Sequence, residues 1–242
     1  MTNSVPSLKQ RGHIAREDVE NGVLEEMITE GELQGHFVRL PEAERDKSRW
    51  SLLADIPPEE DIWLFAYGSL IWSPMIHFVE QRHAELYGFH RQFCMQTKMG
   101  RGTPERPGLM LALENGGSCK GIAFRIAAKD REQELKVIWN REMVGGSYTP
   151  KFVKLHIGVG SDKEPKKEIV RAIAFTMNHA HENYIGKLAI DEVAQALAYA
   201  EGPLGKGEDY LFNTVSHLKE LGLVDHHLFK LARMIRALKG EA

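Results

Sequence analysis

The chain has 242 residues, of which 43% are hydrophobic and 27% are charged. These values are ordinary for a globular protein, and they exclude an intrinsically disordered chain. The 31 Lys and Arg residues against 34 Asp and Glu residues give a formal net charge of −3, so nothing suggests a nucleic-acid partner.

Cysteine usage and hydropathy favour a cytoplasmic protein. The two cysteines, Cys94 and Cys119, are too few for a disulfide framework and form no CxxC pair, which favours a reducing compartment. No apolar run approaches the roughly 18 residues that a membrane-spanning helix needs, and the first residues lack the apolar segment of a secretory signal. We therefore expect no membrane partner, while protein partners and oligomeric state stay open.

Residues 1–60 differ in composition and in hydrophobic pattern from the rest of the chain. Residues 16–33 are acidic and carry apolar side chains at helical spacing, which predicts a helix. Residues 40–61 combine Pro41, Pro57 and Pro58 with a dense mixture of charges, which is typical of a linker. We therefore predict an N-terminal extension and linker over residues 1–60, followed by a catalytic domain over residues 61–242.

The pattern changes to strands from residue 61 onward. The apolar run at 62–66 predicts a buried strand. Further runs of apolar and alternating residues predict strands at 83–89, 91–97, 108–114, 118–127, 151–158 and 168–176.

The remaining predicted elements are helices, the first of which interrupts the series of strands. One helix is predicted at 131–143, and three more close the chain at 188–200, 207–221 and 225–239. Gly202 and Gly222 stand just after two of these helices, and Asp225 is suited to cap the last one. Strands first and helices last indicate an α+β fold.

The segment Tyr67-Gly68-Ser69-Leu70 directly follows the first predicted strand. Glycine and serine at the end of a buried strand allow a sharp turn, and successive backbone N–H groups in such a turn can point at one anion. A plain strand-ending turn would account for the same residues. The tetrapeptide is thus a candidate binding loop.

Glu142 is the candidate acid or base. On the helix predicted at 131–143, the apolar stripe contains Leu135 and Ile138, and Glu142 lies seven and four residues beyond them, near its middle. A carboxylate on a buried face has a raised pKa, as general acid–base chemistry near neutrality requires. A structural ion pair, for instance with Arg141, is the alternative.

Other candidates carry weaker patterns. The basic loop at 101–108 could present Arg101 to a substrate carboxylate, or could simply be a solvated turn. The histidines show none of the spacings of metal sites, and neither cysteine has a neighbouring histidine to activate it. No Walker A, GxGxxG or GxSxG motif is present. The hypotheses of a phosphate-binding-loop protein and of a serine hydrolase therefore lose their main support.

Several of these segments together resemble the ChaC-type, glutathione-specific γ-glutamylcyclotransferase family. Residues 63–72 (WLFAYGSLIW) resemble its F-G-Y-G-S-L-[IV]-W signature. Further motifs resembling those of the family, in the same order, are GFHRQF at 88–93, RGTPERPG at 101–108, RE followed by GGSY at 141–148, GEDYL at 207–211 and LGLVD at 221–225. The resemblance covers about residues 61–238.

The resemblance implies a small mixed β-barrel or sheet flanked by helices. It also implies a cyclotransferase that converts glutathione to 5-oxoproline and Cys-Gly without a metal or organic cofactor, with Glu142 as general base and acid. The substrate-binding residues that it implies are Phe65, Ala66, Tyr67, Gly68, Ser69, Leu70, Tyr148 and Arg101.

Two departures and two alternatives accompany this resemblance. Ala66 replaces a usual glycine, so that its methyl group could crowd the substrate loop, and Asp209 replaces a usual asparagine.

One alternative is a cyclotransferase for other γ-glutamyl peptides or amines. The other is a non-catalytic regulatory or interaction protein linked to cation transport, with the acidic N-terminal segment as its binding region.

Overall fold

A closed, mixed β-barrel forms the centre of the protein. The computed structural model describes residues 12–158 and 167–241. The barrel order is β1-β3-β2-β4-β5, with β1 and β5 parallel. The strands are β1 (Ile62–Ala66), β2 (Glu80–Thr97), β3 (Gly108–Ile126), β4 (Tyr148–Ile157) and β5 (Glu168–Met177). This architecture confirms the predicted α+β class with a mixed barrel flanked by helices.

The strands β2 and β3 each join two segments that the sequence predicts as separate strands. They pair along their whole length, with a register shift between Tyr87 and Phe89. Gly116 and Gly117 lie opposite this shift, and both have positive φ, which glycine adopts without steric cost. The glycines therefore form a bulge inside one long ladder, where the sequence predicted two separate strands at 108–114 and 118–127.

The helices that follow β1 in the chain agree with the predictions. They are α5 (Arg131–Glu142), α6 (Ile190–Tyr199), α7 (Gly207–Glu220) and α8 (His226–Lys239). The Asp225 side chain caps α8 by accepting a hydrogen bond from the Leu228 N–H, and Gly222 follows α7 with φ +68°. Gly202 instead lies in a small hairpin of β6 (Glu201–Gly202) and β7 (Gly205–Lys206).

The N-terminal segment contains α2 (Arg16–Glu20), α3 (Val23–Leu33) and α4 (Glu42–Leu53). The prediction of a linker over residues 40–61 is therefore wrong for most of that stretch. Arg49 of α4 is 1% exposed and pairs with Glu132 of α5 at 2.7 Å. The dense charges that suggested a linker instead connect one helix to another.

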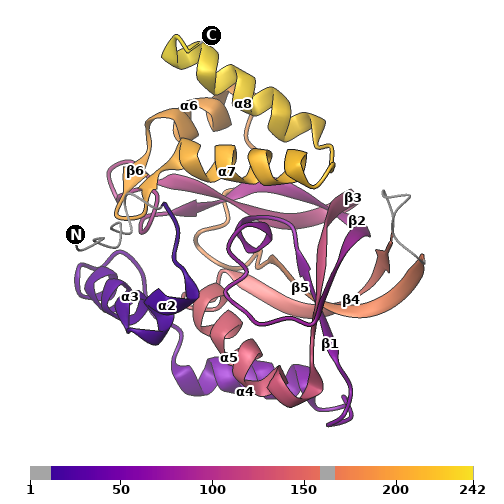
Figure 1. Ribbon diagram of the computed structural model, residues 1–242. Helices are drawn as coiled ribbons and strands as arrows, with labels where there is room; N and C mark the ends of the chain where they lie inside the picture. The colour runs from indigo at the N-terminus through magenta and orange to yellow at the C-terminus, as the bar shows by residue number, and fades with distance from the viewer. Residues whose placement is uncertain (1–11, 159–166, 242) are drawn as a thin grey trace, which may run out of the picture.

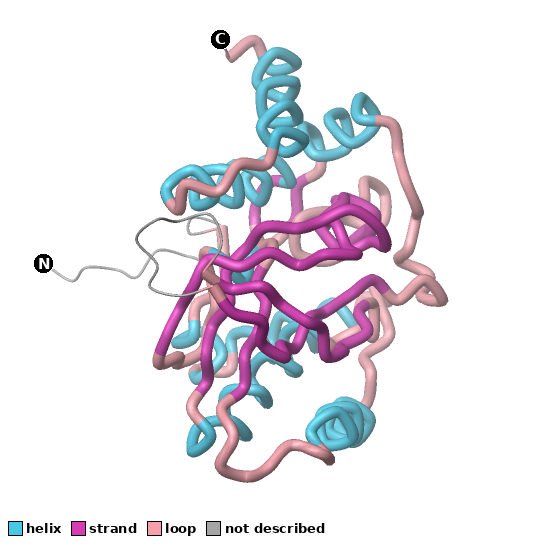
Figure 2. Tube along the Cα trace, turned by 90° about the vertical axis from the view of Figure 1, so that its right-hand side faces the viewer, coloured by secondary structure: helices cyan, strands magenta, loops and turns pink. Residues whose placement is uncertain are grey.

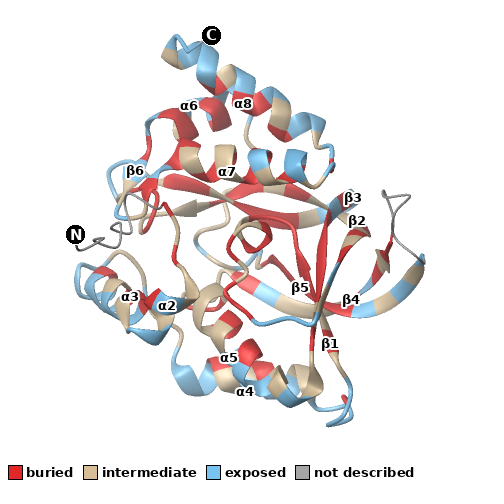
Figure 3. Cartoon of the chain, viewed as in Figure 1, coloured by how far each residue is buried: buried red, intermediate tan, exposed pale blue. Residues whose placement is uncertain are grey.

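The helices cover the barrel on several sides. Figure 1 shows α6, α7 and α8 stacked over β2 and β3, with α4 and α5 at the opposite end and α2 and α3 at the flank. Figure 2, turned by 90°, shows the same separation between the C-terminal helices and the strands. In Figure 3 the buried residues follow the barrel strands and the inner faces of the helices. Among the described residues, no helix is long and apolar enough to cross a membrane.

Candidate active site

Two hollows meet at one mouth of the barrel. The smaller one, here the inner niche, has a volume of about 10 Å³. Its lining residues are Tyr67, Gly68, Ser69, Leu70, Leu111, Glu142, Tyr148, Phe175 and Tyr210. The larger one, here the outer cavity, has a volume of about 230 Å³ and is lined by parts of residues 12–37, 95–101 and 141–148 and by several single residues. The residues common to both hollows are Ser69, Glu142, Tyr148 and Tyr210.

Glu142 stands at the junction of the two hollows. Helix α5 positions it, because Leu135 and Ile138 on the same face are fully buried against the barrel. Burial raises the pKa of the Glu142 carboxyl, and the charge of Arg141 acts in the opposite direction. The Oε1 atom accepts no hydrogen bond from the described residues, although it lies 3.2 Å from the Arg141 Nε as an ion pair. The carboxyl group thus keeps a free acceptor facing the hollow.

The loop after β1 forms the floor of the inner niche. A short 3₁₀ turn, η1 (Ser69–Ile71), follows Gly68 and turns the chain, with the Ile71 N–H donating to the Gly68 carbonyl at 2.9 Å. The backbone N–H groups of Gly68, Ser69 and Leu70 have no hydrogen-bond partner among the described residues. Such unpaired donors beside a buried carboxyl can bind a carbonyl oxygen or a developing oxyanion.

Tyrosine hydroxyl groups fix the walls of the niche. The Tyr67 hydroxyl donates to the Phe175 carbonyl at 2.8 Å, and the Tyr148 hydroxyl donates to the Leu111 carbonyl at 3.0 Å. Burial, followed by the charges of neighbouring groups that include Glu142, raises the pKa of both phenols well above the ordinary value. Both side chains are therefore neutral donors that hold strands together.

Arg101 lies at the mouth of the outer cavity and is 4% exposed. Its guanidinium donates to the backbone carbonyls of Lys206, at 2.8 Å, and Gly12, and it lies 5.7 Å from the centre of the Tyr210 ring. Burial lowers the pKa of Arg101, partly offset by the charge of Asp209. The arginine thus ties the N-terminal segment to the hairpin that precedes α7.

Phe65 and Ala66 do not reach either hollow. Both side chains are 0% exposed in the core, and they act on the loop only through the strand that carries it. The methyl group of Ala66 therefore does not crowd the binding loop, contrary to the concern raised by its replacement of glycine. Asp209 also has a local role, because its Oδ2 accepts a hydrogen bond from the Lys206 N–H at 3.1 Å at the start of α7.

Sequence reasoning missed two contributors to the site. Tyr210 of α7 lines both hollows, and burial with the nearby Glu142 charge raises its pKa to about 12. Its motif was recognised, but nothing in the local spacing placed it beside Gly68. The second contributor is the N-terminal segment, whose Met27 and Phe37 line the outer cavity. Met27 belongs to the predicted helical stripe at 16–33, which gave no indication of what it covers, and no sequence pattern singled out Phe37.

Metal-binding side chains do not gather here. Within residues 12–158 and 167–241, no group of three or more His, Cys, Asp or Glu side chains could hold a metal ion. His181, for example, contacts the Gly145 carbonyl at 2.7 Å and the Ser147 hydroxyl at 3.4 Å. Cys94 is buried, and its burial together with the nearby Glu114 raises its pKa to about 12, so that it is a poor nucleophile.

A barrel whose first strand ends in a Tyr-Gly-Ser-Leu loop facing one buried glutamate defines a γ-glutamylcyclotransferase-like fold. A solved γ-glutamyl cyclotransferase specific to glutathione from yeast superposes with a TM-score of 0.66 at 22% identity, covering 76% of this chain and 100% of that one. The family described as ChaC-like protein matches residues 62–238. The chain belongs to this family, which confirms the resemblance found in its motifs.

Two curated relatives extend this similarity. A glutathione-specific γ-glutamylcyclotransferase from Escherichia coli (strain K12) is 38% identical over 198 residues, which span 82% of this chain and 83% of that protein. The protein with the same name from Schizosaccharomyces pombe is 28% identical over 200 residues, with 75% of this chain and 95% of that protein covered.

Proposed function

We propose that this protein is a γ-glutamylcyclotransferase that cleaves glutathione into 5-oxoproline and Cys-Gly. The observation that carries the proposal is the placement of Glu142, whose carboxyl faces the Tyr67–Leu70 loop across a niche that opens into a larger cavity. The E. coli and S. pombe relatives are both named glutathione-specific γ-glutamylcyclotransferases, which supports the same activity.

The reaction is an intramolecular acyl transfer. The α-amine nitrogen of the γ-glutamyl group attacks its own γ-carbonyl carbon, which forms the ring C–N bond, and the amide C–N bond to cysteine then breaks. Holding the glutamyl arm in a folded conformation supplies effective molarity for this step. The ammonium nitrogen loses two protons on becoming the lactam nitrogen, one before it attacks and one after the ring bond forms. One of these protons goes to the leaving amide nitrogen, which departs as an amine, and the other goes to solvent. The enzyme must therefore take a proton from the attacking nitrogen and supply one to the leaving nitrogen.

Glu142 is suited to both proton transfers. Its raised pKa makes it a stronger base than an exposed carboxylate and a usable acid after it has accepted the proton. The free Oε1 acceptor is available to the substrate ammonium group. One carboxyl group thus serves in sequence, and no metal or organic cofactor enters the mechanism.

The loop at the floor of the niche binds the reacting carbonyl. The N–H groups of Gly68, Ser69 and Leu70 would donate to the carbonyl oxygen and more strongly to the oxyanion of the tetrahedral intermediate. The niche of about 10 Å³ holds one water-sized group, which is the size of that oxygen. Phe65 and Ala66 support the loop from the strand, and Tyr148 positions the facing wall.

The outer cavity receives the leaving dipeptide. Among the described residues, the Lys98 ammonium group makes no ion pair or hydrogen bond, and it lines this cavity. Lys98 is therefore suited to meet the terminal carboxylate. Arg101 supports that carboxylate through its charge, while its donors hold backbone carbonyls.

The remaining assignments belong to the same proposal. Residues 61–242 are the catalytic domain and residues 1–60 its extension. The substrate is a small molecule in the cytoplasm, and neither nucleic acid nor a membrane takes part.

The experiment that tests the function is 5-oxoproline release from reduced glutathione by the purified protein, with γ-Glu-Ala beside it. Release from glutathione in large excess over γ-Glu-Ala would support a glutathione-specific enzyme. Preferential release from γ-Glu-Ala would favour the alternative cyclotransferase. No release from either, by folded protein, would reject the enzyme and favour an interaction protein.

A further inference from the structure

One wall of the outer cavity comes from outside the residues that match the family. The family match begins at residue 62, whereas residues 12–37 contribute apolar side chains to the cavity lining. These side chains are Ile14, Leu24, Met27, Ile28 and Phe37. The N-terminal segment is therefore part of the cavity and not only a surface addition.

Specific contacts hold this segment in place. The Ser73 hydroxyl donates to the Ile14 carbonyl at 2.7 Å, and Arg16 donates to the buried Glu134 at 2.6 Å. Leu24 and Ile28 are buried in a small apolar cluster together with Ile14, Met75 and Val144. Burial of such a cluster stabilises the docked position, so that the segment forms a fixed wall.

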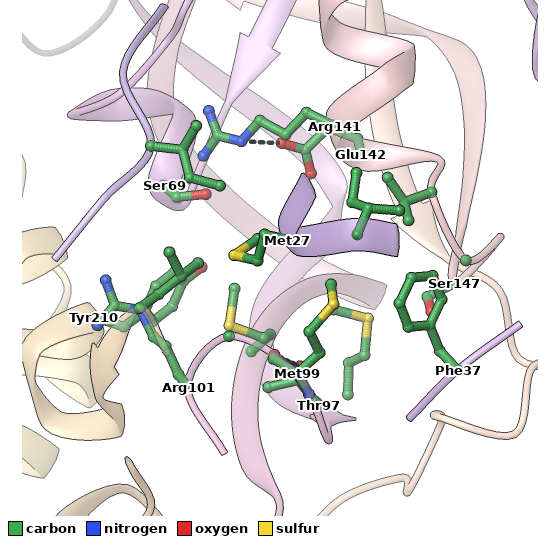
Figure 4. Close-up of a pocket in the computed structure, with 18 of the residues that line it drawn as sticks. Met27, Phe37, Ser69, Thr97, Met99, Arg101, Arg141, Glu142, Ser147 and Tyr210 are labelled. Atoms are coloured by element: carbon green, nitrogen blue, oxygen red, sulfur yellow. Dashed lines mark hydrogen bonds and ion pairs between the residues drawn. The ribbon is translucent and has the colours of Figure 1, made fainter. Parts of the chain in front are cut away.

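Met27 and Met99 form the sulfur-rich part of that wall. In Figure 4 the Met27 side chain lies near the centre of the cavity, between Glu142 on one side and Met99 on the other. Gly31 of α3 leaves the room for Met99, because a Cβ at that position would come within 2.6 Å of the Met99 Sδ. The two thioethers, from the extension and from the loop after β2, thus face the same space.

The charge of the outer cavity limits what this space accepts. Among the described residues, Glu142 is the one carboxylate in the lining, while Lys98, Arg101 and Arg141 carry positive charge. A leaving group with one terminal carboxylate matches this distribution. Beside the methionines, a neutral side chain is favoured, because burying a charge against thioethers is costly.

We propose that the N-terminal segment selects the leaving group, with Met27 and Met99 packing against the side chain of the residue that follows the γ-glutamyl group. Small apolar or thiol side chains are accepted there, and charged ones are excluded. The inference rests on the proposed cyclotransferase function and adds the part of the chain that determines its specificity.

The experiment compares three substrates with different second residues: glutathione, γ-Glu-Gly-Gly and γ-Glu-Asp-Gly. Replacing Met27 by alanine should lower kcat/KM for glutathione about 5- to 20-fold, because the thioether contact is lost. The value for γ-Glu-Gly-Gly, which has no side chain to contact Met27, should change less than about twofold. Met27→Lys should raise the preference for γ-Glu-Asp-Gly over glutathione at least about tenfold.

Glu26→Ala is the matched control, since Glu26 is the exposed neighbour of Met27 on α3. Circular dichroism of each variant establishes that the fold is retained. An equal loss on all three substrates, or no loss on any, would overturn the specificity role. So would a Met27→Lys variant with the parent's selectivity. A parent that releases no 5-oxoproline from any of them would reject the proposed function, and the inference with it.

Discussion

The hydroxyl group of Tyr210 lies directly over the backbone of Gly68, where a Cβ would approach it to 2.8 Å. Gly68 belongs to the loop after the first barrel strand, and Tyr210 belongs to α7 near the end of the chain. The φ of Gly68 is −134°, outside the left-handed region, so the need for glycine is one of space. Both residues line the inner niche, so a larger side chain at position 68 would displace Tyr210 or the loop.

Gly68→Ala should raise KM for glutathione by about tenfold or more, because the added methyl group pushes Tyr210 or the loop out of place. Steady-state kinetics of 5-oxoproline release measure this effect. Adding Tyr210→Phe removes the hydroxyl that the methyl group meets, so the double variant should recover much of the loss. If the two effects simply multiply, the contact with Tyr210 is not the cause.

Glu142→Gln should reduce turnover by about 10²-fold or more, because the amide can neither accept nor return the proton. Burial raises the folded-state pKa of Glu142, so stability is lost as the pH rises through that pKa. The neutral variant should therefore be at least as stable as the parent at pH 7 in urea denaturation. Glu59→Gln serves as control, because Glu59 is an exposed carboxylate that makes no ion pair among the described residues. A folded Glu142→Gln protein with parental turnover would exclude the residue from catalysis.

The pH dependence of kcat/KM should show an acid limb above the ordinary carboxylate pKa of 4.5, since Glu142 must be ionised to act as a base. The charge of Arg141 lowers that pKa, so Arg141→Gln should move the limb to higher pH. The control is Arg131→Gln, because Arg131 lies at the other end of α5 and donates to the Pro57 carbonyl. If the acid limb of kcat/KM lies at the same pH in Arg141→Gln as in the parent protein, that limb does not report the ionisation of Glu142.

Arg16→Ala should lower the free energy of unfolding by about 2 kcal/mol, because it removes a charged partner from the buried Glu134. Equilibrium urea denaturation gives this value. Lys136→Ala removes an exposed ion pair with Glu42 and should cost no more than about 0.5 kcal/mol. Equal effects of the two variants would mean that the N-terminal segment is not anchored through Arg16.

Local spacing was sufficient to predict most of the elements. The apolar run at residues 62–66 predicted one strand, because a short continuous apolar run is typical of a strand buried on both faces. The apolar stripe of α5 predicted one helix, because a 3.6-residue period marks one buried face. The same stripe singled out Glu142. The motifs identified the family, and the loop after β1 followed from Gly68 and Ser69 at the end of a buried strand.

The sequence failed where contacts join distant segments. Residues 42–53 form a helix whose Arg49 pairs with Glu132 of α5, and no local pattern identifies that partner. Phe65 and Ala66 belong to a binding motif, yet both are fully buried: as neighbours on a strand their side chains point to opposite faces of β1, and both faces are covered.

The sequence by itself determined most of the secondary structure after residue 61, the family and the carboxyl group available for acid–base chemistry. Only the tertiary structure decided that Tyr210 lines the niche beside Gly68 and that Met27 lines the outer cavity. The physical reason is that burial and helical periodicity are properties of one segment, whereas a cavity depends on how several segments pack together. Residues 12–37 show this most clearly, since their apolar stripe predicted a buried face and the barrel mouth supplied the surface that it covers.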